Sequence, residues 1–318
     1  MEKQIDLLTI GDACIDLFMR IGDGSAQEEN IKGNPEICFI HGSKIPVETF
    51  ESSIAGNAVN VSVGTQKLGL KTFVYCELGD DLNAEKVITQ LNEHGVATDY
   101  CIKNAGTPTD VHPIIIYKGE RTIFIYHAPR QYKVHKWPAP KWLYYSSIGR
   151  HFEKFQEELV NYLKKNPKIG VVFNPGTFHI KAGISSIENF LEISHVLLLN
   201  KEEAVSLTGE ESLENLHKKL REKGPKLTII TDGKKGSSAW DGHEFVQIPA
   251  FKNNLPITDK TGAGDAYSSG LISALYYNKP LKEAMLWGSI NSSNVIRKIG
   301  AINGLVDKTG MERFVEQK

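Results

Sequence analysis

The sequence predicts an α/β fold with a doubly wound, mostly parallel central sheet, helices on both faces of that sheet, and a small β-rich lid. Three observations support this prediction. Short apolar runs alternate with segments whose apolar residues recur at helical spacing, an order typical of βαβ units. Two β-rich stretches interrupt the alternation, and a glycine-rich turn opens one of the last helices.

The strands of the main sheet are predicted from short apolar runs, and the helices from periodic ones. Residues 5–11 form an apolar run that ends in glycine, which suits a buried parallel strand. Further strands are predicted at 72–78, 142–146, 169–173, 196–199 and 227–231, with a closing hairpin at 237–240 and 244–248. Helices are predicted at 57–68, 83–93, 152–165, 185–192, 202–207, 213–223, 263–277 and 281–296. Pro280 separates the last two.

Two stretches form the predicted lid, inserted into a single domain that spans residues 1–318. Residues from about 17 to 54 have mixed polarity, several glycines and no helical pattern. From about 97 to 126, β-rich runs at 114–117 and 122–126 flank a short polar turn and predict a hairpin. We expect both stretches to join one small antiparallel sheet that stands off the main body. Such a sheet needs a partner for its apolar face, either a ligand or a second subunit in a homodimer.

The composition is that of an ordinary globular protein. The 318 residues are 41% hydrophobic and 24% charged, with a formal net charge of −1. This balance gives no electrostatic case for a nucleic-acid or membrane partner. The four cysteines form no Cys-x-x-Cys pair and are expected to be buried thiols. We find no signal peptide and no apolar run near the ~20 residues of a membrane span, so the expected location is the cytoplasm.

The turn Asp259-Lys-Thr-Gly-Ala-Gly-Asp265 opens the helix predicted at 263–277. Its glycines let backbone N–H groups gather at a helix N-terminus, where unpaired donors and the helix dipole favour an anion. Asp265 would repel a bound phosphate unless it takes a proton from the group that attacks the phosphate. The turn therefore indicates phosphoryl transfer. A purely structural alternative is that the aspartate only caps the helix.

Other polar residues follow the carboxyl ends of the predicted strands, where ligands bind in open parallel sheets. Asn200 and Glu203 lie on one side of a first helical turn, so Glu203 suits hydrated Mg²⁺ beside a phosphate. The alternative is a capping box between the same two residues. The run Thr231-x-Gly233-x-x-Gly236 suits a nucleotide that approaches the backbone, whereas the P-loop pattern Gly-x-x-x-x-Gly-Lys-Ser/Thr is absent.

A third group of polar residues suits a neutral polyol. Asp16 follows the first strand, and Gly56, Asn57 and Asn60 lie at the start of the helix predicted at 57–68. A capping role would explain Asn57, but Asn60 falls among small apolar residues and can bind a hydroxyl group. Basic residues are scarce around these positions, which favours a neutral acceptor.

These motifs, in this order, resemble the ribokinase-like (PfkB) family of carbohydrate kinases over essentially the whole chain. The resemblance rests on the segments 11–16, 55–69, 79–81, 200–203, 231–236 and 259–265. It implies a kinase that uses ATP and Mg²⁺ and phosphorylates a hydroxymethyl group of a small sugar, of the ribose or fructose type. One departure is Ala55, where the first signature usually has glycine. The added methyl group is expected to narrow the sugar pocket or to shift its turn.

The resemblance also implies the catalytic residues and the metal sites. Asp265 would be the general base, and the backbone N–H groups of the anion hole would come from Gly262, Ala263 and Gly264. Glu203 would contact Mg²⁺ through water. Some members bind K⁺ beside the anion hole, through the equivalents of Asp259, Thr261 and the loop near Gly300.

The binding residues are implied in the same way. Those that border the nucleotide and its phosphates would be Asn200, Glu203, Thr231, Gly233, Gly236 and, near adenine, Asn291. Those that hold acceptor hydroxyls would be Asp16, Gly56, Asn57 and Asn60.

The acceptor stays open at this point. A nucleoside kinase of the adenosine type is the alternative enzyme, since lid aromatics such as Phe18, Phe39 and Tyr126 can stack on a base. A non-catalytic ligand-binding homologue is a further alternative, although a pure binder needs no base at Asp265. A Rossmann dehydrogenase lacks support, because no Gly-x-Gly-x-x-Gly follows the first strand.

Overall fold

A nine-stranded sheet forms the body of the protein in the computed structural model, which describes residues 4–31 and 34–316. Its strand order is β15-β14-β13-β12-β11-β10-β1-β6-β7. The strands are β1 (Leu7–Ile10), β6 (Thr72–Gly79), β7 (Ala97–Asn104), β10 (Trp142–Tyr145), β11 (Gly170–Phe173), β12 (Val196–Asn200), β13 (Leu227–Thr231), β14 (Ser237–Trp240) and β15 (Phe245–Ile248). From β13 to β7 all neighbours run parallel, whereas β14 and β15 add an antiparallel hairpin. The predicted mostly parallel sheet is confirmed.

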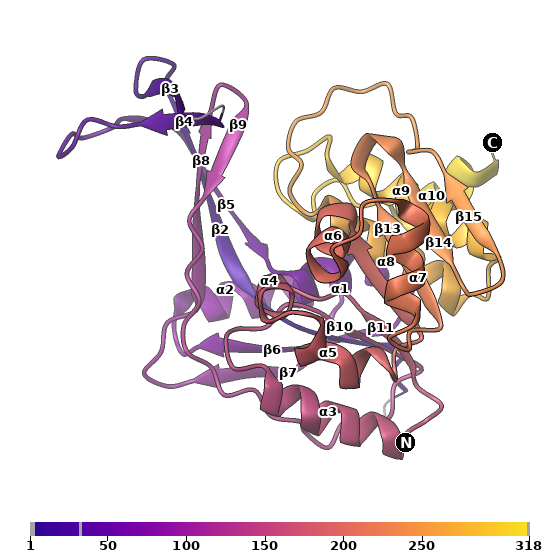
Figure 1. Cartoon of the computed structure of the whole chain (residues 1–318). Helices are drawn as coiled ribbons and strands as arrows, with labels where there is room; N and C mark the ends of the chain where they lie inside the picture. The colour runs from indigo at the N-terminus through magenta and orange to yellow at the C-terminus, as the bar shows by residue number, and fades with distance from the viewer. Residues whose placement is uncertain (1–3, 32–33, 317–318) are drawn as a thin grey trace.

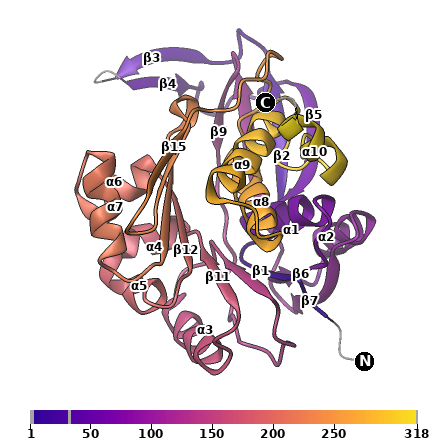
Figure 2. The same ribbon diagram turned by 90° about the vertical axis from the view of Figure 1, so that its right-hand side faces the viewer.

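Helices cover both faces of this sheet because the strands are apolar on both faces. Leu7 and Leu8 point to opposite faces, and both are fully buried. Helices α3 to α7 lie on the face of Leu8, and α1, α2 and α8 to α10 lie on the other side (Figure 2). The helices are α1 (Asn57–Lys67), α2 (Leu82–Glu93), α3 (Glu153–Lys165), α4 (Thr177–Ala182), α5 (Ile184–Leu191), α6 (Lys201–Thr208), α7 (Leu213–Arg221), α8 (Ala263–Tyr276), α9 (Leu281–Val295) and α10 (Lys308–Glu316).

A second, smaller sheet stands beside the body as a lid (Figure 1). Its order is β5-β2-β8-β9, and a two-stranded ribbon of β3 and β4 extends from it. The strands are β2 (Cys14–Ile21), β3 (Gln27–Ile31), β4 (Asn34–Cys38), β5 (Val47–Ala55), β8 (Asp110–Tyr117) and β9 (Glu120–Ile123). Several large apolar side chains of the lid are exposed, Phe50 and Ile125 by 61% and 62%, so a homodimer through this surface stays a prediction.

The lid differs from the sequence-based expectation in two ways. It is a mixed sheet, because β2 and β8 run parallel while β5 and β9 pair antiparallel with them. The stretch from 97 to 126 also does not belong to the lid as a whole. Its first part is β7, which pairs parallel with β6 at the edge of the main sheet. Tyr100 and Ile102 of β7 pack against the core of the body, and this burial holds the strand there.

Within the described residues, 4–31 and 34–316, none of the helices has the length and apolar character required to cross a bilayer.

Helices α4 and α10 were not predicted from the sequence. Only Met311 of α10 is buried, so the apolar periodicity of that segment is weak.

The close contact of α8 with α9 yields a first prediction. A Cβ atom at Gly270 would lie 2.5 Å from the carbonyl oxygen of Trp287. Gly270→Ala is therefore expected to lower the free energy of unfolding by about 1–3 kcal/mol, as overpacking does in other cores. Urea unfolding followed by circular dichroism measures the change. Gly264→Ala is the matched control on the same helix, since a Cβ there meets no atom within 4 Å. Equal midpoints for the two variants would contradict the prediction.

Candidate active site

The turn before α8 has the geometry expected of an anion site. Gly262 is the N-cap of α8 and adopts a left-handed conformation, with φ of 73°. A Cβ atom at this position would lie 2.4 Å from the Cβ of Ala301, so only glycine fits. Gly264 has open space where a side chain would begin. Gly262, Ala263 and Gly264 all border a cavity at the start of α8, where the first N–H groups of a helix favour an anion.

Asp265 lies in the first turn of α8, and this residue is 8% exposed. Asn57 donates a hydrogen bond of 3.0 Å to Oδ1, and Asn60 donates one of 2.8 Å to Oδ2. Burial raises the pKa of Asp265 to about 6, while the two amide donors act in the opposite direction. A carboxylate with this pKa is a proton acceptor near neutral pH.

Two adjoining cavities meet at this turn. The one that we call the nucleotide-side cavity has a volume of about 320 Å³ and is bordered by Thr231, Gly233, Lys234, Gly236, Ala250, Phe251, Ile257, Lys260, Ala263, Gly264, Tyr267, Ser289, Ser292, Ser293, Ile296 and Arg297. The Asp265 cavity, of about 220 Å³, is bordered by Asn57, Asn174, Leu198, Leu199, Asn200, Glu203, Thr231, Lys260, Gly262, Ala263, Gly264 and Asp265. Ala263 and Gly264 border both. The N-terminus of α8 thus lies between a partly apolar cavity and a more polar one that is bordered by a buried acid.

The glycines of the loop after β13 have two different roles. Gly236 has a φ of 97°, and a Cβ atom there would lie 2.0 Å from the carbonyl oxygen of Ile248, so backbone packing requires glycine. A Cβ atom at Gly233 would meet no atom within 4 Å, so this glycine leaves open space at the cavity wall instead. Thr231, Gly233 and Gly236 all border the nucleotide-side cavity, and their contact with a nucleotide stays a prediction.

Asn200 and Glu203 form the capping box that the sequence left as an alternative. Asn200 Oδ1 accepts from the N–H of Glu203, and Glu203 Oε2 accepts from the N–H of Asn200, both at 2.8 Å. Both residues also border the Asp265 cavity, and the box leaves Asn200 Nδ2 and Glu203 Oε1 unused. Burial raises the pKa of Glu203, and the charge of Asp265 raises it further. Two acids that repel each other beside a polar cavity fit a hydrated Mg²⁺.

The structure places Asn291 elsewhere than the sequence suggested. This side chain is fully buried between α8 and α9 and does not border the nucleotide-side cavity. Its amide donates to the carbonyl oxygen of Ala266 at 3.1 Å and to Ser269 Oγ at 2.8 Å, and its oxygen accepts from the N–H of Val306 at 2.9 Å. Both ends of the amide are bonded inside the protein, so the predicted position of Asn291 near adenine is wrong.

The lid contributes an acid, a thiol and a histidine near the body. Asp16 on β2 is 5% exposed, and its Oδ1 lies 3.5 Å from His112 Nδ1 on β8. Cys14 Sγ lies 3.4 Å from the same nitrogen, and the three atoms form a set that has the chemistry of metal ligands. Among the described residues His112 Nε2 is buried without a hydrogen-bond partner. No sequence pattern pointed to His112, because it lies far from Asp16 along the chain.

Gly56 supports the site rather than lining it. Its φ is 109°, and a Cβ atom would lie 2.2 Å from the carbonyl oxygen of Asp12, so the start of α1 packs directly on the chain after β1. Asn57 and Asn60, which follow it on α1, donate hydrogen bonds to Asp265, whereas their contact with acceptor hydroxyls stays a prediction. Ala55 is buried at the end of β5 and pairs with Cys14.

The residues expected around K⁺ are brought together, but a side chain occupies their centre. Asp259 Oδ1 accepts from Thr261 N–H at 2.9 Å and from Arg121 Nη1 at 2.6 Å, and Oδ2 accepts from Gly300 N–H at 2.9 Å. Arg121 Nη1 also contacts Thr261 Oγ1. Arg121 belongs to β9 of the lid, and its guanidinium fills the place of a cation. The group as it stands does not fit a bound K⁺.

The comparisons with known proteins agree with this geometry. The model of the pfkB family carbohydrate kinases matches residues 13–308. The chain belongs to this family. It is therefore a kinase with the ribokinase-like fold, and its relatives act on sugars or nucleosides.

Three relatives illustrate the range of the family. The ATP-dependent 6-phosphofructokinase of Thermoanaerobacterium thermosaccharolyticum is 23% identical over 322 residues, 96% of this chain and 92% of that protein. The structure of Arabidopsis thaliana ribokinase complexed with ribose and ATP has a TM-score of 0.81 at 20% identity, covering 99% of both chains. The nucleoside kinase of Methanocaldococcus jannaschii has a TM-score of 0.78 at 19% identity, also covering 99% of both. The structural similarity shows the fold and leaves the acceptor undecided.

The environment of Asp265 predicts a pH profile. Because the base works only when unprotonated and its pKa is about 6, kcat/KM is expected to fall about tenfold for each pH unit below 6 and to be level above 7. Asn60→Ala removes a donor to the carboxylate and is expected to move the break to higher pH. Asp12→Asn is the control, because burial raises the pKa of Asp12 to about 6 as well. A break that disappears in the control would assign the titration to Asp12 instead.

Proposed function

We propose that the enzyme transfers the γ-phosphoryl group of ATP to a hydroxymethyl group of a small sugar, with Asp265 as the general base. One observation carries the proposal. The buried carboxylate of Asp265, held by two amide donors, borders the Asp265 cavity directly after Ala263 and Gly264, which border both cavities. An acid in that position can take a proton from a hydroxyl group that attacks a phosphate at the start of α8.

The nucleotide-side cavity suits ATP. Its apolar wall includes Phe251, Ile257 and Tyr267, which can pack against a base, and the loop at Gly233 offers backbone groups to the ribose and phosphates. Lys260 borders both cavities and supplies positive charge where the phosphates would pass. The phosphate chain would then end at the backbone N–H groups of 262–264.

Mg²⁺ would be held near Glu203 and Asn200 through water, and when bound it neutralises charge on the phosphates. The chain itself supplies the rest of the step. Asp265 takes the hydroxymethyl proton, the hydroxymethyl oxygen forms a bond to the γ-phosphorus, and the bond from that phosphorus to the β–γ bridging oxygen breaks to release ADP. The N–H groups of the Gly262–Gly264 turn stabilise the charge on the transferring group.

The acceptor would lie between Asp265 and the lid. Asp16 and the amides of Asn57 and Asn60 offer oxygen and nitrogen atoms that pair with sugar hydroxyls, and His112 Nε2 is a further unused polar atom. The amide nitrogens of Asn57 and Asn60 donate to Asp265, and each amide also carries an oxygen that can accept from a hydroxyl group. Binding of the acceptor would therefore replace the bonds to Asp265 only in part.

A nucleoside acceptor is the second candidate, and one observation favours it. Tyr126 is 47% exposed and borders a large cavity beside the lid, so its ring is available to stack on a base. Phe18 is 3% exposed and buried within the lid, so it is not available in this way. A panel of ribose, fructose, adenosine, inosine and cytidine in a coupled ADP assay separates the two acceptor classes.

Asp265→Asn tests the assigned base. The variant is expected to fold and to bind ATP as the parent does, while kcat falls about 10²- to 10⁴-fold, because the amide cannot accept the proton. Calorimetry with ATP and a coupled assay give the two quantities. Asp80→Asn changes an exposed aspartate and is expected to keep the parent rate. Parent-like turnover by Asp265→Asn would remove the carboxylate from the mechanism.

A further inference from the structure

A third cavity, of about 630 Å³, lies beside the acceptor side of the site and is strongly basic. We call it the basic cavity, and it is bordered by Ile125, Tyr126, His127, Ala128, Pro129, Arg130, Arg150, His151, Thr177, Phe178 and Lys181. Three of these residues are permanent cations, two are histidines, and none is an acid. The whole chain has a net charge of −1, so this lining is a local excess of positive charge.

Two of the cations are available to a ligand. Arg150 and Lys181 are exposed, and in the described part of the chain no carboxylate pairs with either. The guanidinium of Arg150 lies over the ring of Phe178, 5.6 Å from its centroid, which keeps the group at the cavity wall. Arg130 has a different role, since its side chain is 2% exposed and bonded to Thr107, to the carbonyl of Pro108 and to Asp110.

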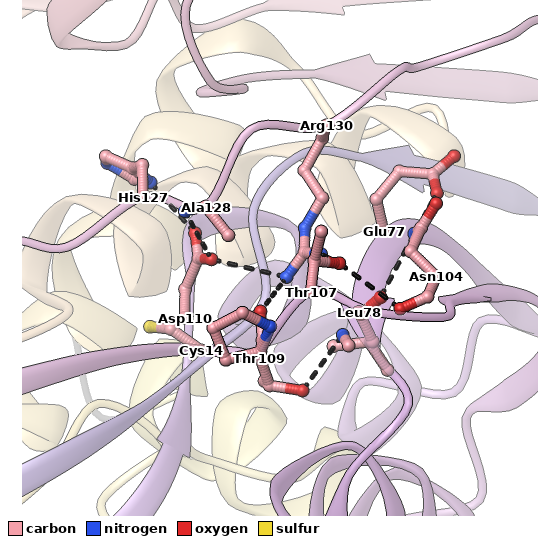
Figure 3. Close-up of polar contacts among 12 residues, drawn as sticks. Cys14, Glu77, Leu78, Asn104, Thr107, Thr109, Asp110, His127, Ala128 and Arg130 are labelled. Atoms are coloured by element: carbon pink, nitrogen blue, oxygen red, sulfur yellow. Dashed lines mark hydrogen bonds and ion pairs between the residues drawn. The ribbon is translucent and has the colours of Figure 1, made fainter.

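Figure 3 shows Asp110 beside His127, Ala128 and Arg130, three residues that border the basic cavity. Its carboxylate accepts from Ala128 N–H at 3.0 Å and lies 3.0 Å from His127 Nδ1. The hydrogen bond to Asp110 raises the pKa of His127, which favours the imidazolium form. The ring of His127 meets that of His112, with centroids 5.5 Å apart, and His112 contacts Asp16. The sugar-side residues and the basic cavity are thus neighbours.

We propose that the acceptor carries an anionic group, a phosphate or a carboxylate, at the end opposite its hydroxymethyl group, and that Arg150 and Lys181 bind this anion in the basic cavity. This inference rests on the proposed function, because it uses the same acceptor site. The polar groups near Asp265 satisfy hydroxyls without any cation, so a neutral sugar would leave the cations of the basic cavity without a partner. The expectation of a neutral acceptor was based on residues 56–60. It did not consider the segments at 125–130, 150–151 and 177–181.

The test compares each anionic sugar with its neutral parent in a coupled ADP assay. Fructose 6-phosphate against fructose represents the phosphate arm, and gluconate against glucitol represents the carboxylate arm. We expect kcat/KM for one anionic member to exceed that of its parent. Arg150→Gln is expected to lower that value about 10- to 100-fold, mainly through KM, and to leave the neutral parent unchanged. Lys181→Gln is expected to act in the same direction.

Arg313→Gln on α10 is the matched control, because it removes an exposed arginine outside the cavity. If the neutral parents are better substrates and Arg150→Gln behaves as Arg313→Gln does, the anion site is wrong while the kinase activity stands. If no acceptor is phosphorylated, the proposed function fails, and calorimetric titration with fructose 6-phosphate and gluconate decides the anion site separately. Binding that Arg150→Gln abolishes supports the site, and no binding to the parent enzyme overturns it.

An independent observation concerns the turn before α8. We infer that Arg121 supplies the positive charge that this turn requires, so that the enzyme needs no monovalent cation. The guanidinium contacts Asp259 and Thr261, directly before the N-cap Gly262, and Asp259 in turn accepts from Gly300 N–H. Because Arg121 lies on β9, the same contact ties the lid to the anion hole.

The test replaces KCl by choline chloride and measures kcat and KM. The parent enzyme is expected to keep its kcat, whereas Arg121→Met is expected to lose kcat about 10-fold or more and to regain part of it with K⁺. Arg121→Lys is expected to restore activity without K⁺, because it restores a charge. A parent enzyme that needs K⁺ for activity would overturn the inference. A loss of kcat in Arg121→Met that K⁺ does not reverse, together with an equal loss in Arg121→Lys, would overturn it as well.

Discussion

The burial of one carboxylate at the start of α8 is the constraint on which the rest of the site depends. Removing the charge of Asp265 from water is costly, and in the described part of the chain no cation pairs with it. Two amide donors from α1 and the positive end of the α8 dipole hold the charge instead. These partners leave the pKa of Asp265 near neutrality. At neutral pH the group is therefore largely unprotonated and still basic enough to accept a proton. A salt bridge would have stabilised the anion further and made it a weaker base.

The two sides of the reaction come from different parts of the fold. Under the proposed function the body supplies the donor side, because the carboxyl ends of β12 and β13 and the N-terminus of α8 meet at one edge of the parallel sheet. The lid supplies Asp16, His112 and Arg121, and the segment after β9 borders the basic cavity. On this proposal, acceptor recognition can change through the lid while the turn before α8 stays fixed by Gly262, which packs too closely on Ala301 for any side chain.

Local patterns predicted the parallel sheet, the turn at 259–265 and the residues of the Asn200–Glu203 box, because neighbouring residues along the chain decide each of these. Contacts between distant segments could not be predicted. Asn57 and Asn60 reach Asp265 across the molecule, Arg121 enters the place assigned to K⁺, and Asn291 is buried by packing between helices. The stretch that contains β7 was assigned to the lid because β-rich sequence shows strand formation but not which sheet the strand joins.

The charged side chains around the proposed acceptor site are distributed unevenly. Asp265 and Asp16 lie at one end and the cations Arg150 and Lys181 at the other, with His112 and His127 between them. A molecule with an anion at one end is repelled from the acids and attracted to the basic cavity, so only one orientation is favourable. That orientation presents the uncharged hydroxymethyl end to Asp265. With the proposed anionic acceptor, this arrangement would orient the reacting hydroxyl by electrostatics, and the amides of Asn57 and Asn60 would then fix its final position.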